Sequence, residues 1–131
     1  MLYRYNSMFM DRQFAEFELH HGQVIFLAQL FTQDGMTQED LTSLLSFDKA
    51  TTAKAMKNLE LLGYIERLPD DVDKRCKRIK LTFKARLIEQ RFFEVLDRFE
   101  ALATSGMTIG EIKLLAKLMK RMTRNVSALG R

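Results

Sequence analysis

The sequence predicts a mainly α-helical (α+β) domain that contains one β-hairpin. Apolar residues recur at helical spacing along most of the 131 residues, and only the segment after Gly63 changes to strand-like alternation. Helix start and stop residues divide the helical part into six segments. A chain of this length has room for one domain with its own core.

Three helices are expected before residue 46. The first covers residues 2–14 and the second residues 20–33, where apolar positions form one stripe. Thr37 can cap a short third helix, because its hydroxyl can accept a backbone N–H and acids follow in the first turn.

A fourth helix and a hairpin follow at close spacing. Asp48 can cap this helix, and Gly63 can end it in the left-handed conformation. Its apolar side should pack inward, and its other side carries Lys49, Ala53, Lys54 and Lys57 without an acid. A break at residues 69–71 separates two strand-like stretches that form the hairpin. A basic helix followed by a basic hairpin predicts a winged helix-turn-helix.

Two long helices complete the chain. Thr82 can cap a helix that ends near residue 104, and Thr108 with Glu111 forms a capping box for a helix that reaches about residue 127. The last helix is apolar on more than one side, which predicts a homodimer. The expected dimer contacts are Tyr5, Phe99, Ile112, Leu115, Met119 and Met122.

We therefore expect a single domain over residues 1–131, in which the long terminal helices form the dimerisation region. Residues 1–33 and 87–131 would supply the core and dimerisation helices. Residues 34–86 would form the winged-helix lobe.

The charge is concentrated on the hairpin. The chain has a net charge of +4, and residues 74–86 hold seven basic residues and no acid. Such a surface suits a polyanion, and double-stranded DNA is the partner expected. A solvated basic face is the alternative, in which case the domain would be a non-enzymatic protein-interaction module without specific DNA binding.

The sequence contains no motif typical of a membrane protein, an enzyme or a metal-binding protein. No apolar run is long enough to cross a membrane and no signal peptide is visible, so we expect a cytoplasmic protein without a membrane partner. Cys-x-x-Cys, His-Glu-x-x-His and phosphate-cradling glycine motifs are absent. Two adjacent histidines and one distant cysteine do not supply a metal site, and we expect no enzyme, cofactor or metal.

Three parts of the chain are distinctive: residues 36–41, residues 48–51 with 59–60 and 63–67, and residues 73–75 with 78–82. These residues resemble MarR-type winged-helix transcription regulators. The resemblance covers about half of the chain. It implies a repressor in which the fourth helix enters the major groove and the hairpin tip reaches the minor groove. It also implies an ion pair between Asp73 and Arg75. The DNA-binding positions expected are Thr37, Gln38, Lys49, Thr51, Ala53, Lys54, Lys57, Lys74, Arg75 and Lys77. Thr52 and Ala53 depart from the family pattern, which leaves the bases that are read open.

The resemblance also implies a small aromatic effector that relieves repression. Flexible methionine and aromatic side chains suit such a pocket, although ordinary core packing is the alternative for each residue. The pocket residues expected are Met8, Phe9, Phe14, Phe17, His20, His21 and Met36. Some MarR-like regulators sense oxidants through cysteine, and the basic residues that flank Cys76 should lower its pKa. We nevertheless expect this residue to be a bystander in the hairpin.

Overall fold

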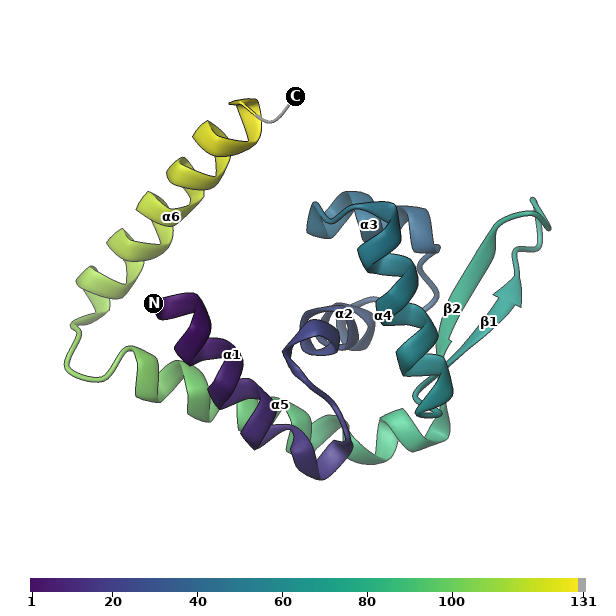
Figure 1. The fold of residues 1–131 in the computed structure, drawn as a ribbon, viewed down its shortest axis with the longest axis horizontal. Coiled ribbons are helices and arrows are strands. Elements are labelled where there is room, and N and C mark those ends of the chain that lie inside the picture. Colours follow the sequence, from purple (N-terminus) through teal and green to yellow (C-terminus); the bar gives the residue numbers. More distant parts are fainter. Residues whose placement is uncertain (130–131) are drawn as a thin grey trace. The chain divides into compact units, whose positions relative to one another are not determined.

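The computed structural model describes residues 1–129. It contains helices and one small two-stranded sheet (Figure 1). The elements in order are α1 (Leu2–Gln13), the 3₁₀ turn η1 (Ala15–Phe17), α2 (His21–Thr32), α3 (Gln38–Leu45), α4 (Lys49–Leu61), β1 (Ile65–Pro69), β2 (Lys77–Leu81), α5 (Phe83–Ala103) and α6 (Ile109–Leu129). The mainly α fold with one hairpin is confirmed. The turn η1 was not predicted.

The chain divides into two compact units, Met1–Val95 and a second unit that begins at Leu96. The division into a dimerisation region and a winged-helix lobe stays a prediction. No helix among residues 1–129 is long and apolar enough to span a membrane.

The core of the first unit lies where α2, α3, α4 and the hairpin meet. Leu27, Leu41, Met56 and Leu59 are completely buried there. The phenol of Tyr64 donates a 2.7 Å hydrogen bond to the backbone carbonyl of Phe17, which ties η1 to the start of the hairpin. The buried Met56 and Leu59 show that the inward side of α4 is apolar, as the spacing of its apolar residues predicts. The basic side of α4 is exposed.

The hairpin is anchored to the connection between α2 and α3 by backbone and side-chain hydrogen bonds and ion pairs. β1 and β2 pair antiparallel, with Arg67 opposite Ile79. Ile79 donates its N–H to Met36 O at 2.8 Å and accepts the N–H of Gly35 at 3.0 Å. Asp34 accepts the N–H of Leu81 at 2.9 Å and lies 3.5 Å from Lys80 Nζ and 3.3 Å from Arg86 Nη2. These bonds fix the hairpin beside α3.

The predicted helix ends are confirmed by their hydrogen bonds. Thr37 Oγ1 accepts the N–H of Asp40 at 3.0 Å, and Thr82 Oγ1 accepts that of Ala85 at 3.3 Å. Thr108 and Glu111 form the expected capping box, with bonds of 2.8 and 3.1 Å. Gly63 has φ +84°, the left-handed conformation that ends α4.

Candidate nucleic-acid-binding surface

The outward side of α4 is a basic face that its amino-terminal cap helps to position. Asp48 Oδ1 accepts the N–H of Thr51 at 2.6 Å, and Oδ2 accepts its hydroxyl at 3.0 Å. These hydrogen bonds lower the pKa of the Asp48 carboxyl, which stays ionised at the positive end of the helix dipole. The hydroxyl of Thr51, a predicted DNA-binding residue, therefore already donates a hydrogen bond within the chain.

The cations of this face are exposed and uncompensated. Lys49, Lys54 and Lys57 are exposed and Ala53 is half-buried, whereas Thr52 on the opposite side is completely buried. Within residues 1–129, none of the three lysines lies in an ion pair. Their charges are therefore available to an anionic ligand.

The tip of the hairpin is organised by Asp70. Its carboxylate accepts the N–H of Asp73 at 3.1 Å and a hydrogen bond from Arg78 Nε. The backbone bond to Asp73 and the interaction with Arg78 lower the Asp70 pKa. Arg78 Nη1 also donates to Gly35 O at 2.8 Å, so the tip is joined to the α2–α3 connection.

Two of the predicted DNA-binding residues extend from this tip. Lys74 is exposed, and 93% of the Arg75 side chain is exposed. Arg75 Nε lies 3.2 Å from Asp73 Oδ1, which confirms the expected ion pair. The tip therefore presents two cations that only one acid partly compensates.

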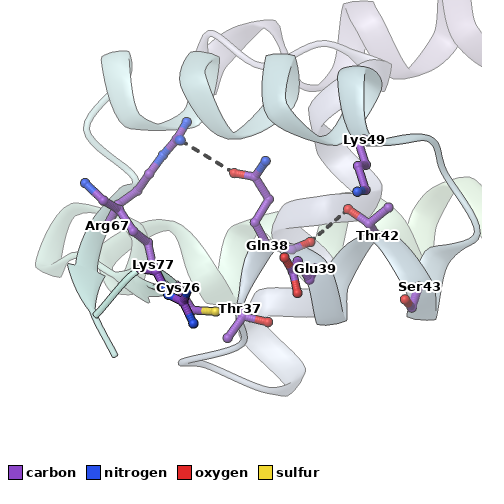
Figure 2. A pocket seen from close by; sticks show the side chains of 10 residues that line it. Thr37, Gln38, Glu39, Thr42, Ser43, Lys49, Arg67, Cys76 and Lys77 are labelled. Carbon is purple, nitrogen blue, oxygen red and sulfur yellow. Dashed lines mark hydrogen bonds between the residues drawn. The ribbon is translucent and has the colours of Figure 1, made fainter. Parts of the chain in front are cut away.

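A groove joins α3, the start of α4 and the hairpin (Figure 2). Five of the ten predicted DNA-binding residues line it, and the others lie farther along α4 or at the hairpin tip. The lining consists of Thr37, Gln38, Glu39, Thr42, Ser43, Lys49, Arg67, Arg75, Cys76 and Lys77. Four of these are cations and one is an acid, so the groove suits an anion.

Arg67 is a groove residue that lies outside the predicted set. Its Nη1 donates to Gln38 Oε1 at 3.5 Å (Figure 2). Its Nε lies 3.8 Å from Glu60 Oε2. The Nε atom is buried and has no hydrogen-bond partner within the described part of the chain. The alternation of residues along β1 could have predicted this position. Arg67 is two residues after the buried Ile65 and therefore lies on the side of the strand that faces the helices.

The expectation for the Cys76 thiol is corrected by the structure. Burial raises its pKa, and the nearby carboxylates of Asp73 and Glu39 raise it further. Cys76 Sγ lies 3.7 Å from Asp73 Oδ2. The sequence places cations beside this residue, but the fold brings acids to its sulfur.

The seven predicted effector-pocket residues occupy two kinds of environment. Phe14, Phe17 and Met36 are buried, and Phe14 packs on Phe92 with ring centroids 5.0 Å apart. The others are half-buried or exposed: Met8, Phe9, His20 and His21. None of the seven lines the groove described above. The effector pocket stays a prediction.

The predicted dimerisation residues on α6 belong to an apolar side that is exposed in the single chain. Helix α6 has no buried residue, and the exposed fractions of Leu115, Met119 and Met122 are 41%, 54% and 66%. Tyr5 is exposed, and Ile112 and Phe99 are half-buried. Their role in a dimer stays a prediction.

A capped basic helix that follows a short helix and precedes a basic hairpin defines the winged helix-turn-helix class of regulators. The model of the MarR family matches residues 19–77. A MarR protein from Peptoclostridium difficile is 30% identical, with a TM-score of 0.88 over 95% of this chain and 82% of that chain. The chain belongs to the MarR family of transcriptional regulators.

Two further relatives extend the comparison. The uncharacterized HTH-type transcriptional regulator YybA of Bacillus subtilis is 29% identical over 114 residues, which are 87% of this chain and 76% of that protein. A MarR family regulator from Listeria monocytogenes, solved with a 26mer DNA, is 28% identical with a TM-score of 0.88. The match covers 97% of this chain and 85% of that chain.

Proposed function

We propose that this regulator binds double-stranded DNA sequence-specifically as a homodimer and represses transcription by occupying its site. The observation that carries this proposal is the unpaired basic face of α4, which lies on the same compact unit as the basic hairpin. The related Listeria regulator, solved with DNA, supports the same partner.

In this proposal α4 reads bases and the hairpin supplies affinity. An α-helix fits the major groove, where lysine and arginine recognise guanine edges and threonine contacts either base or phosphate. Lys54 projects from the middle of the outward face of α4 and is the base-reading candidate. Lys74 and Arg75 at the exposed hairpin tip are the candidates for phosphate contacts. Such contacts add affinity but do not depend on the base sequence.

Homodimer formation would cover the apolar side of α6. Leu115, Met119 and Met122 recur at helical spacing and are exposed in the single chain. Burying such residues in a second copy removes apolar surface from water, and a two-fold dimer would present two winged helices to one duplex.

Relief of repression by a small aromatic effector completes the proposal. His21 Nδ1 lies 2.8 Å from Asp11 Oδ1, and Tyr3 meets the His21 ring edge-on with centroids 6.2 Å apart. These residues join α1 to the start of α2 beside the expected pocket. A ligand that shifts α1 against α2 would therefore act on the helices that support the DNA-binding lobe.

Two lysine variants test whether Lys54 recognises a base and Lys74 contacts a phosphate. The preferred site is first selected from randomised duplex DNA, and binding is then titrated with salt on specific and random duplexes. If Lys54 meets a guanine edge, Lys54→Ala costs about 1–3 kcal/mol on the preferred site and narrows the preference over random DNA. Lys74→Ala weakens all sequences alike and lowers the salt slope by about one for each phosphate that is no longer neutralised.

Lys84→Ala is the control, because the Lys84 ammonium bonds to Leu62 O at 2.6 Å and lies 4.8 Å from the Tyr64 ring centre rather than on the basic face. Binding by both lysine variants that equals the parent's would contradict the proposal. The protein-interaction module would then replace it.

A further inference from the structure

Helix α6 carries a straight row of cations on the side opposite its apolar residues. Lys113, Lys117, Lys120 and Arg124 are separated by four, three and four residues, and all four are exposed. On a helix with 3.6 residues per turn they lie within roughly 60° of one another and extend over roughly 16 Å. We call these four residues the α6 row.

Nothing in the described part of the chain neutralises the α6 row. None of its members takes part in an ion pair within residues 1–129. The acid of this helix, Glu111, accepts the N–H of Thr108 at 2.8 Å in the capping box. Helical spacing places Glu111 on the far side of the helix from the row.

The surface of α6 is hollowed at the carboxyl end of the row. A shallow pocket there is lined by Met119, Lys120, Thr123 and Arg124. Two cations one turn apart thus flank a depression, and Thr123 Oγ1 donates to Met119 O at 2.9 Å inside it. An anionic oxygen seated in this depression would meet both cations.

We propose that the α6 row is a second, sequence-independent surface for the phosphates of duplex DNA. This surface includes neither α4 nor the hairpin, and it goes beyond the proposed reading of a specific site. Lysine and arginine that contact phosphates release condensed counterions, which gives affinity without base recognition. The regulator would then hold DNA through α6 as well as through its winged helix.

The chemistry of the row favours DNA over an anionic membrane or an acidic protein. A helix that lies on a membrane inserts its apolar side and keeps its cations on the polar side, so membrane binding requires an apolar side that nothing else covers. The apolar side of α6, with Leu115 and Met122, is the side that the proposed homodimer covers, so it would not be available for insertion into a membrane. Protein interfaces need aromatic or apolar anchors at their centre, and the row has none.

The test compares two triple variants that lose the same charge. Lys113→Gln/Lys117→Gln/Lys120→Gln removes most of the row, and Arg4→Gln/Arg12→Gln/Arg98→Gln removes three exposed helical arginines that lie outside it. Binding to a random-sequence duplex is titrated with salt, and sedimentation checks that both variants keep the parent's oligomeric state.

We expect the row variant to lower the salt slope by about 0.9 for each phosphate that the row no longer neutralises and to weaken binding roughly tenfold at low salt. The arginine variant should change the slope by less than one. In a Lys54→Ala/Lys74→Ala background, residual binding to the random duplex should persist, and it should weaken further with a lower salt slope when the row is removed. Preference for the selected site should remain in the row variant, so failure of the row and failure of specific reading give different results.

Equal slopes for the parent and the row variant would overturn the proposal, as would equal losses of affinity in the two triple variants. Vesicles of phosphatidylserine and phosphatidylcholine supply a third result. Binding to these vesicles that depends on the row, together with unchanged DNA binding, would assign the row to a membrane surface and overturn the proposal.

Discussion

Cys76 has an environment that suppresses thiolate formation. Its sulfur lies 3.7 Å from an Asp73 carboxylate oxygen, and burial together with Asp73 and Glu39 raises the pKa of the thiol. The thiolate is the nucleophilic form, so a raised pKa slows reaction with oxidants at neutral pH. The position of Cys76 in the groove between α3, α4 and the hairpin does not by itself make it a sensor.

We predict that Cys76→Ser leaves DNA binding and its response to peroxide unchanged. Alkylation of Cys76 in the parent should be slower at pH 7 than alkylation of an unperturbed thiol, and should speed up only as the pH rises past the ordinary range for cysteine, about 8.5. Iodoacetamide kinetics against pH measure this. Release of DNA by peroxide from the parent, but not from the serine variant, would reveal a redox switch.

The hairpin is an element whose tip depends on one ionised carboxylate. Asp70 is almost completely buried, and its oxygens hold the backbone of Asp73 and the side chain of Arg78. Because Arg78 also bonds to Gly35 O, the same carboxylate indirectly connects the tip to the start of α3. The position of Lys74 and Arg75 therefore depends on Asp70.

We predict that Asp70→Asn destabilises the protein at neutral pH and flattens the acid side of its stability profile. A lowered folded-state pKa contributes stability that is fully present above the unfolded value, about 3.9, and that is lost as the pH falls through the folded value. The difference in free energy of unfolding between parent and variant should thus shrink below about pH 4. Urea unfolding between pH 6 and pH 2 measures it.

Asp71→Asn is the matched control for this element. Asp71 is exposed, and no hydrogen bond or ion pair involves its side chain within residues 1–129. Its variant should follow the parent at every pH. An equal effect of the two substitutions would mean that general charge, rather than the bonds of Asp70, governs the hairpin.

The elements were predictable where local chemistry decides them. Asp48, Thr82 and Thr108 accept backbone N–H groups three residues ahead, and Gly63 takes the conformation that side chains disfavour. These interactions span a few residues, so the sequence displays them directly. The alternation over residues 77–81 likewise predicts a strand that is buried at Ile79.

The site was predictable only in part because its other contacts join distant segments. Asp34 meets Leu81, and Arg67 meets Gln38, across 47 and 29 residues. Spacing along the chain contains no signal for such pairs, since they depend on how the hairpin folds back over α3. The same folding partly buries Cys76 and brings Glu39 near it, and burial together with Asp73 and Glu39 reverses the pKa shift expected from the adjacent cations.

At the scale of the whole molecule, α6 has two sides with different requirements. The side that holds Leu115, Met119 and Met122 is apolar and exposed in the single chain. The opposite side is the α6 row, which is suited to water or to phosphates. The two sides meet at Met119, which lines the pocket beside Lys120. A dimer that covers Leu115 and Met122 leaves Lys113 and Lys117 accessible, so homodimer formation and the proposed second DNA surface are compatible.

We predict that the regulator is a dimer at micromolar concentration and that Leu115→Asp dissociates or unfolds it. A carboxylate at this position would be buried without a partner in the dimer, which is strongly unfavourable, whereas the same group in a single chain stays in water. Sedimentation measures the mass, and far-ultraviolet circular dichroism separates dissociation from unfolding. Lys117→Asp puts the same carboxylate on the opposite side of α6 and should leave the mass at twice that of the 15.3 kDa chain. A parent protein that sediments as a monomer would contradict the predicted dimer. A Leu115→Asp variant that stays a folded dimer would mean that the dimer contact does not include Leu115.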